Sequence, residues 1–431
     1  MSHDATGDAR RTVRSAGPLR DAPGSVLGVP CARWKEEARA LFGVPQGPVA
    51  GTGHQAEWWH PGIVAKFEHA RALAAECGGT ATVWLVVDTD VRDPLELRVP
   101  MREHGALVAH VVRAGRRRAQ GTVACARPAV MPGDCESVAA RCEPACAAEG
   151  LHRAWASLAR HSRARDAAEQ VVLAQRDLLP AIGVPGAVVR TSSLLSAGLG
   201  RAIAEHAARH PHECARAFNE AVRLVPRVAR PLAEPLRGGG TELPFWTDAG
   251  DGTRAPVTDA ALPALLRDGA PLWPRAFLTS VIARASLCDR FVHGLGGEVY
   301  ERATEAFARR FLDAELPAFD VATATVRLPF EPDARAAPLG EDERRRRWFD
   351  PDGEGRPSAA KRALLERIAA LPRGSPARRE AWRRMHDELE AQRLTRAAEF
   401  RALDERAAAD RARATEARLR ADRTWAAVLG R

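Results

Sequence analysis

Two short segments of the sequence gather side chains that could bind a small molecule and move a proton on it. The segment TGHQ covers residues 52–55 and is followed by Lys66, and VDTD covers residues 87–90. An imidazole, an ammonium group and carboxylates are the groups that acid–base and charge-stabilising catalysis use. The candidate catalytic residues are His54, Asp88 and Asp90, and the candidate binding residues beside them are Gly53, Gln55 and Lys66.

A third segment, HGLGGE at residues 293–298, places glycines directly before a predicted helix. The free amides at a helix N-terminus attract anions, and glycine lets a ligand approach the backbone closely. Helix capping is the commoner role of such a glycine loop, so the pattern alone leaves both roles open. The candidate anion-binding residues are His293, Gly294, Gly296 and Gly297.

Lysine is rare in this chain, which holds three lysines, Lys35, Lys66 and Lys361, against 61 arginines. A compact ammonium group and a planar guanidinium are not interchangeable, so a lysine retained against this bias is informative. The position of Lys66 in a stretch rich in Gly, His and Trp favours a role in binding an anion. A solvated position on a helix is the alternative.

The elements around these residues resemble one β-α-β unit. Apolar residues at helical spacing predict a helix over residues 63–77, closed by glycines, and TATVWLVV at 80–87 is typical of a buried parallel strand. TGHQ then falls on the first loop, and Asp88 and Asp90 fall at the carboxyl end of the next strand. Ligands of open α/β sheets bind at this edge, so we expect one shared crevice.

Shifts in composition divide the chain into six predicted parts. They are a disordered polar tail (1–25), a first part of an α/β core (26–135), a helical insertion (136–236), a second part of the core (237–330), a charged linker (331–357) and a helical arm (358–431). In the arm, Trp382, Met385 and Leu389 keep the spacing of a coiled-coil seam, which predicts an arm that packs against a partner or forms a homodimer with a second copy of the chain.

Length and composition exclude several classes of protein. At 431 residues and 45% hydrophobic, the chain is long enough for two or three folding units. No apolar run reaches the roughly 18 residues of a membrane span, and the first residues lack an apolar signal core, which predicts a cytoplasmic protein with no membrane partner. The net charge of +9 comes from scattered arginines with few aromatics, which argues against a nucleic-acid partner.

Standard signatures of metal and nucleotide sites are missing from the sequence. Cys125, Cys135, Cys142 and Cys146 lie close together, but their spacing does not give the paired C-x2-C pattern of zinc sites. We therefore predict free thiols and no metal site. The chain also lacks G-x-G-x-x-G, G-x-x-x-x-G-K-[ST] and G-x-S-x-G, so no standard dinucleotide, P-loop or serine-hydrolase site is predicted.

The run from TGHQAEWWHPGIVAKFEHA to TATVWLVVDTD resembles the opening of the bacillithiol biosynthesis cysteine-adding enzyme family. That family begins with a TGQQ-type turn, a GP-type turn, a helix that carries Lys and a strand that ends in an EDHD-type motif. This chain keeps Gly53, has His54 at the third position of the turn, and keeps Asp88 and Asp90 without the Glu and His. The HQ…PG…K run is also similar to a family of polysaccharide-locus proteins.

The resemblance implies an α/β protein with a Rossmann-like parallel sheet core, a helical insertion and a C-terminal coiled-coil arm. It implies a ligase that joins cysteine to the amine of a glucosaminyl-malate, a small-molecule substrate. A sugar-nucleotide or nucleotidyl transferase that uses the same crevice is one alternative. A non-catalytic interaction protein that works through its arm is another. The cofactor stays open, with ATP or ADP and Mg²⁺ as the candidates.

Overall fold

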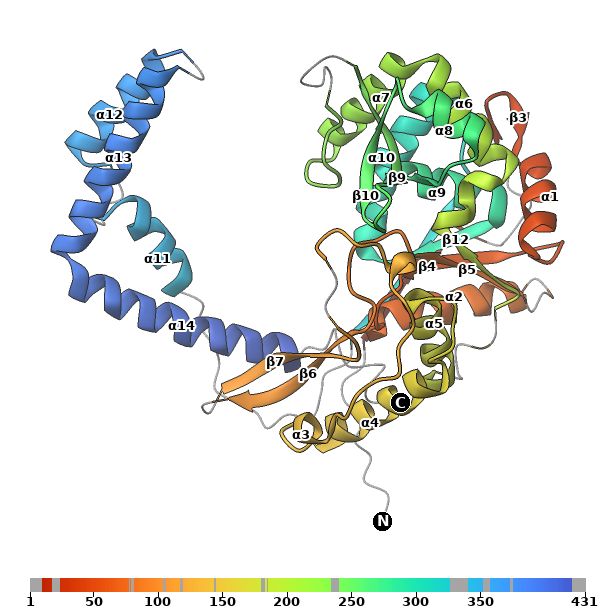
Figure 1. The fold of residues 1–431 in the computed structure, drawn as a ribbon, viewed down its shortest axis with the longest axis horizontal. Coiled ribbons are helices and arrows are strands. Elements are labelled where there is room, and N and C mark those ends of the chain that lie inside the picture. Colours follow the sequence, from red (N-terminus) through yellow and green to blue (C-terminus); the bar gives the residue numbers. More distant parts are fainter. Residues whose placement is uncertain are drawn as a thin grey trace. The chain divides into compact units, whose positions relative to one another are not determined.

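The structure is a computed structural model (Figure 1). It describes residues 10–17, 24–76, 78, 81–103, 106–116, 119–142, 145–179, 183, 185–233, 240–325, 340–351, 357–372 and 375–420. These residues form two compact units. The larger lies within residues 10–325, and the smaller comprises residues 340–420 together with residues of the hairpin at 101–109.

The larger unit is of the mixed α/β class, as predicted, and is built on a six-stranded sheet with the order β1-β13-β12-β4-β5-β8. Strand β1 is antiparallel to β13, and the other five strands are parallel. From β4 the chain moves outward to β5 and β8, and then returns to the other side of β4 with β12 and β13. The strands are β1 (Arg10–Arg14), β4 (Ala50–Gln55), β5 (Thr82–Val87), β8 (Ala187–Arg190), β12 (Arg290–His293) and β13 (Phe319–Thr325).

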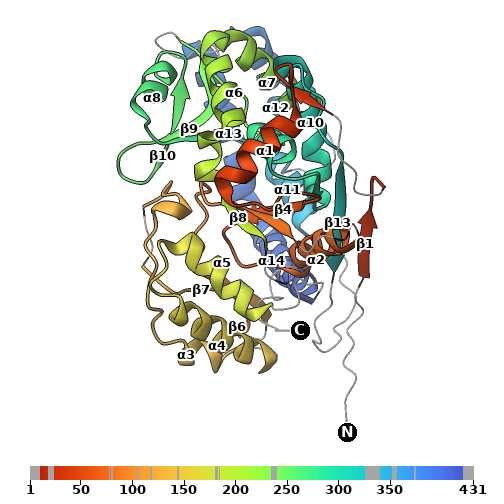
Figure 2. The ribbon, with the colours of Figure 1, turned by 90° about the vertical axis from the view of Figure 1, so that its right-hand side faces the viewer.

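Helices cover both faces of this sheet, because alternate side chains of each buried strand point to opposite faces. On one face, Ala50 and Val292 pack with Ala70, Leu73 and Ala74 of α2 (Pro61–Glu76). On the other face, Val83, Leu85 and Phe291 belong to a larger apolar cluster with residues of α1, α6, α7, α9 and α10. Figure 2 shows α2 below the sheet and α6, α7 and α10 above it.

The remaining elements up to residue 312 lie outside the central sheet, and the hairpin β6-β7 among them belongs in part to the smaller unit. A three-stranded antiparallel sheet has the order β10-β9-β11, and β2-β3 and β6-β7 form two-stranded sheets. The elements are α1 (Cys31–Phe42), α3 (Glu136–Ala139), α4 (Ala145–Arg160), α5 (Ala167–Leu178), α6 (Gly198–Arg209), α7 (Pro211–Leu224), α8 (Leu262–Asp268), α9 (Phe277–Ile282), α10 (Leu295–Leu312), β2 (Ser25–Val26), β3 (Val29–Pro30), β6 (Glu96–Glu103), β7 (Ala106–Arg113), β9 (Glu242–Asp248), β10 (Arg254–Thr258) and β11 (Leu272–Pro274).

The structure corrects four predicted boundaries. The predicted helical insertion 136–236 contains β8, which is a strand of the central sheet, so these residues belong in part to the core. The predicted tail 1–25 contains β1, although residues 1–9 and 18–23 lie outside the described residues. Residues 290–293, directly before the glycines of HGLGGE, form strand β12, which was not predicted, and TGHQ ends strand β4 instead of forming a loop. Strands of four or five residues are too short to show a period in sequence.

The smaller unit contains the predicted arm, formed by α12 (Ala359–Ala370), α13 (Pro376–Thr395) and α14 (Ala397–Arg420). Helix α11 (Gly340–Phe349) lies inside the predicted linker 331–357, and an ion pair of 2.6 Å joins Arg347 to Glu399 of α14. Met385 and Leu389 pack between α13 and α12, whereas Trp382 is 48% exposed, so the predicted seam is only partly buried. No described helix combines the length and the apolarity needed to cross a membrane.

Candidate functional site

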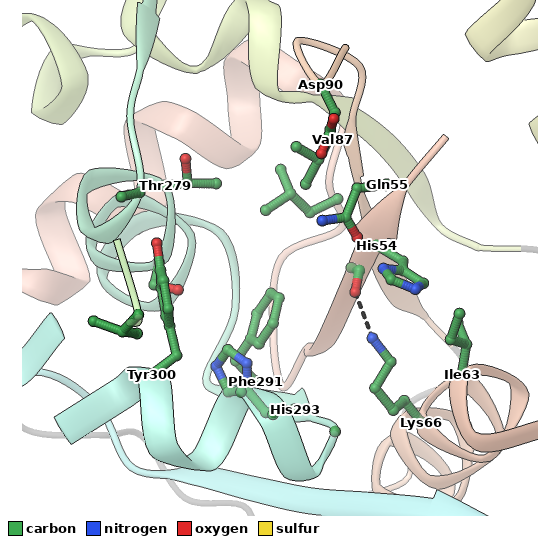
Figure 3. A pocket seen from close by; sticks show the side chains of 18 of the residues that line it. His54, Gln55, Ile63, Lys66, Val87, Asp90, Thr279, Phe291, His293 and Tyr300 are labelled. Carbon is green, nitrogen blue, oxygen red and sulfur yellow. Dashed lines mark hydrogen bonds between the residues drawn. The ribbon is translucent and has the colours of Figure 1, made fainter. Parts of the chain in front are cut away.

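A cavity of about 940 Å³ opens at the carboxyl ends of β4 and β12 (Figure 3). Its walls come from the central sheet, from the first turns of α2 and α10, and from the small sheet β10-β9-β11. The structure brings nine of the ten predicted site residues to this one cavity. They are Gly53, His54, Gln55, Lys66, Asp90, His293, Gly294, Gly296 and Gly297.

The pairing of β4 with β12 explains why two distant segments meet. In this parallel pair Phe291 lies opposite Gly51 and Val292 lies opposite Thr52, so the carboxyl ends of the two strands lie side by side. A side chain at Gly53 would not fit, since a Cβ there would lie 2.6 Å from the carbonyl oxygen of Leu85. Glycine is therefore required for the close pairing of β4 with β5 at the edge of the cavity.

Lys66 lies in α2, and its Nζ donates a hydrogen bond of 2.6 Å to the carbonyl oxygen of Gly53 (Figure 3). The side chain is buried, and among the described residues no carboxylate lies within ion-pair distance of it. Burial lowers the pKa of Lys66 to about 8, and Glu57 opposes this shift. A buried ammonium group without a carboxylate partner at a cavity wall is suited to an anionic ligand.

His54 points toward Ile63 at the start of α2, whereas Gln55 points the other way, toward Val87 and Asp90 (Figure 3). Burial lowers the pKa of His54 well below its usual value, and Lys66 and His60 add to the shift. Its Nε2 lies 3.4 Å from Oε1 of Glu57, which accepts hydrogen bonds from Arg92. The neutral imidazole can accept a proton from a ligand at neutral pH.

His293 ends β12 and packs between the rings of Phe291 and Phe319. Its Nε2 lies 3.3 Å from Oε1 of Glu301, and Glu301 also accepts a hydrogen bond from Arg284. Burial lowers the pKa of His293 well below its usual value, and Lys66 and Arg284 act in the same direction. Burial raises the pKa of Glu301, and Arg284 opposes this shift. The cavity thus holds a second neutral imidazole, beside a buried carboxyl group.

Gly297 and Gly296 have different roles at the start of α10. A Cβ at Gly297 would lie 2.7 Å from Nδ1 of His293, whereas a Cβ at Gly296 would meet nothing within 4 Å. Gly294 is the N-cap residue and offers no capping side chain, and in the first turn the amide of Gly297 bonds the carbonyl oxygen of Gly294 at 2.9 Å. These glycines leave room for the His293 ring and open the helix N-terminus to the cavity.

Gly297→Ala is expected to lower the free energy of unfolding by about 1–3 kcal/mol, because the new methyl group displaces the buried ring of His293. The matched variant Gly296→Ala adds the same methyl group into open space, so its stability should stay within about 0.5 kcal/mol of wild type. Urea unfolding of the three proteins measures both values. Equal stability of the two variants would contradict the packing of His293 against Gly297.

Asp88 is the one predicted site residue that does not line the cavity. Its carboxylate is fully buried, accepts a hydrogen bond of 2.7 Å from Nε of Arg190, and accepts two more from the amide and the hydroxyl of Ser192. Arg190 also bonds Asp166 at the start of α5. Asp88 therefore joins β5 to β8 and α5. This network leaves Asp90 as the only carboxylate among the described residues that line the cavity.

Several residues that line the cavity were not among the predicted site residues. Arg230, Arg254 and Arg275 line the wall formed by the small sheet, together with Trp246, and Tyr300 lines the wall formed by α10. With 61 arginines in the chain, composition does not mark any one of them as special. Tyr300 is the only tyrosine, and this was the one available signal. Burial raises the pKa of its hydroxyl group, which keeps it protonated.

The two tryptophans of the β4–α2 loop are core residues. Trp59 stacks on Phe67 with ring centroids 4.1 Å apart and packs edge-on against Trp84. Gln175 of α5 holds the loop, because it accepts a hydrogen bond from the amide of Trp59 and donates one to the carbonyl oxygen of Glu57. The helices between β5 and β8 therefore position the loop that follows His54.

The cysteines do not join this site. Cys125, Cys135 and Cys142 are free thiols, as predicted, and the side chain of Cys146 lies outside the described residues. Burial raises the pKa of Cys125 to about 12 and that of Cys142 to about 11. The described residues hold no group of three or more His, Cys, Asp or Glu side chains placed to bind a metal ion.

No protein-family model matches this chain, and no curated protein matches it either.

Proposed function

We propose that the chain is a ligase of the cysteine-adding type, which joins the carboxylate of cysteine to the amine of an amino sugar in the cavity between β4 and β12. The convergence of three distant segments carries this proposal. Residues of TGHQ, VDTD and HGLGGE, with Lys66, line one cavity large enough for two small substrates. A purely structural role for the glycines would not require His54, Lys66, Asp90 and His293 to meet there.

The order of the parallel strands supports a Rossmann-like core. The order β8-β5-β4-β12-β13 corresponds to 3-2-1-4-5 in chain order, which is the doubly wound arrangement. Ligands of such sheets bind where the order reverses, and here the reversal lies between β4 and β12. In this proposal the helices α12 to α14 would correspond to the coiled-coil arm of the cysteine-adding enzymes, and the packing of Met385 and Leu389 against α12 supports this.

The side chains in the cavity fit the steps of amide formation. The ammonium group of Lys66 and the first-turn amides of α10 would hold the carboxylate and the negative charge that develops on it. The amine loses a proton as it bonds to the carboxyl carbon, so the reaction needs a base close to this nitrogen. His54 and His293 line the cavity as neutral imidazoles and can accept that proton.

The hydrogen-bond donors that would hold a carboxylate can also hold the phosphates of a nucleotide. Phosphate oxygens accept hydrogen bonds from an ammonium group and from helix N-terminal amides, which Lys66 and α10 supply. Mg²⁺ is commonly held by one or two carboxylates together with the phosphates, and Asp90 is the carboxylate that lines the cavity. When bound, ATP would activate the carboxylate, so that one carboxyl oxygen leaves with a phosphate group of the nucleotide as the carbon–nitrogen bond forms.

Thermal unfolding in the presence of ligands tests this function. Cysteine and glucosaminyl-malate, each with ATP and Mg²⁺, are expected to raise the melting temperature of the wild type. The increase in melting temperature should be lost in Lys66→Met. When the wild type is given both substrates with ATP and Mg²⁺, mass spectrometry should find the amide product. Protection by a sugar nucleotide alone, without amide product, would support the transferase instead. If no cavity ligand protects the chain, both enzyme functions are wrong.

A further inference from the structure

Three guanidinium groups gather on the wall of the cavity that comes from the small sheet. Arg254 begins β10, Arg275 directly follows β11, and Arg230 lies in the segment between α7 and β9. None of them belongs to the strands or helices that carry His54, Lys66 and His293. This wall is therefore distinct from the part of the cavity described above.

The carboxylate of Glu242 pairs with two of these three cations, and the charge of Asp90 acts on the third, Arg254, without an ion pair. Oε1 of Glu242 accepts hydrogen bonds from Arg275 at 2.6 Å and from Arg230 at 2.8 Å, and Oε2 is used by the amide of Ala233. Arg254 bonds only the carbonyl oxygen of Thr89 at 3.3 Å, and it forms no ion pair with another described residue. The wall therefore carries more positive than negative charge.

The two inner guanidinium groups are fixed in place by one aromatic ring. The Cζ atoms of Arg254 and Arg275 lie 4.7 and 4.5 Å from the ring centroid of Trp246. Burial lowers the pKa of both arginines, since their charges are partly removed from water. Arg275 is buried and paired with Glu242, Arg230 is exposed, and Arg254 is half-buried without an ion-pair partner among the described residues. A charge partly removed from water favours a partner of opposite sign, and arginine forks match the geometry of carboxylate and phosphate groups.

The backbone beside Arg275 is strained. Ala276 lines the cavity at the turn into α9, with φ at 49° and ψ at −115°, a region that residues other than glycine rarely adopt. Strained residues of this kind cluster at ligand sites, where the surrounding structure maintains them. The turn fixes the direction of Arg275, whose guanidinium also bonds the carbonyl oxygen of Arg230.

We propose that Arg254, Arg275 and Trp246 form a second oxyanion subsite, which binds a carboxylate or phosphate group separately from the one bound at Lys66 and α10. The cavity would then hold two anionic groups at once. This inference depends on the geometry of the cavity and on no particular reaction, so it stands even if the ligase function fails.

Counting bound sulfate ions tests the subsite. Equilibrium dialysis with radiolabelled sulfate at low ionic strength is expected to give two ions per wild-type chain and one in either Lys66→Met or Arg254→Gln. Arg267→Gln is the matched control, because it removes the same charge from an exposed position on α8 outside the cavity. This control should keep two ions. Circular dichroism checks that each variant is folded.

The outcomes separate the two sites and the two ligand classes. One sulfate per wild-type chain, lost in Lys66→Met and kept in Arg254→Gln, would overturn the second subsite. In Lys66→Met, displacement of the remaining sulfate by succinate assigns the subsite to carboxylates, and stronger displacement by inorganic phosphate assigns it to phosphates. If neither ion displaces it, the proposal is wrong. Arg254→Lys should retain binding with a several-fold loss of affinity.

Discussion

Asp88→Ala is expected to lower the free energy of unfolding by about 3 kcal/mol. The substitution leaves the buried guanidinium of Arg190 with Asp166 as its remaining carboxylate, and it removes both hydrogen bonds from Ser192. Strands β5 and β8 would lose a polar link at their carboxyl ends. Urea unfolding followed by far-UV circular dichroism measures the loss.

Asp90→Ala is the matched control for this prediction. Asp90 lies two residues further along the chain, lines the cavity and accepts one hydrogen bond, from the amide of Arg92. Its removal should cost less than about 1 kcal/mol in stability while it changes ligand binding. If Asp88→Ala is as stable as wild type and loses ligand binding, Asp88 belongs to the site and the structural role assigned to it is wrong.

Sulfate bound at Lys66 is expected to lose about tenfold in affinity between pH 7 and pH 9. The pKa of Lys66 is lowered to about 8 by burial, so the ammonium group that attracts the anion is present at pH 7 and mostly deprotonated at pH 9. Sulfate keeps its charge over this range, so the change reports on the protein. Dialysis of Arg254→Gln, which should retain only this site, measures the affinity at each pH.

Lys66→Arg separates the charge of Lys66 from its other contributions, because arginine stays protonated throughout this range. Its sulfate affinity should change by less than about twofold between the two pH values.

Lys66→Met should stay folded. The pKa of Lys66 is lower in the folded chain than in the unfolded chain, so the charged form costs stability below pH 8 and the cost declines as the pH rises. Equal pH dependence in Arg254→Gln and in the double variant Arg254→Gln with Lys66→Arg would contradict the role of Lys66.

Much of the site could be predicted because its residues lie at element ends that have clear sequence signals. The apolar run before Asp88 is confirmed as β5, and the helix that carries Lys66 is confirmed as α2. Parallel strands place their carboxyl ends on one edge, so a β-α-β pattern alone brings TGHQ close to VDTD. The strand that carries His293 could not be predicted in this way, since β12 has only four residues and no periodic pattern marks it.

Asp88 shows the limit of this reasoning. Asp88 and Asp90 have the same chemistry and equivalent positions in the sequence, but they differ in what approaches them. Strand β8 brings Arg190 and Ser192 to Asp88, and no periodic pattern marked this strand within the predicted helical insertion. The partner of a charged group is set by contacts across about 100 residues of chain, so sequence spacing could not assign the two roles.

The sequence by itself determined the α/β class, the edge of the sheet that carries the polar residues, and the helical character of the C-terminal segment. Local pattern is enough for these, because burial and backbone geometry act over a few neighbouring residues. Only the tertiary structure decided which carboxylate is structural and which two arginines, of 61, stack on Trp246 at one wall. Charge balance and cavity shape depend on distant chain segments, and these meet only when the sheet has formed.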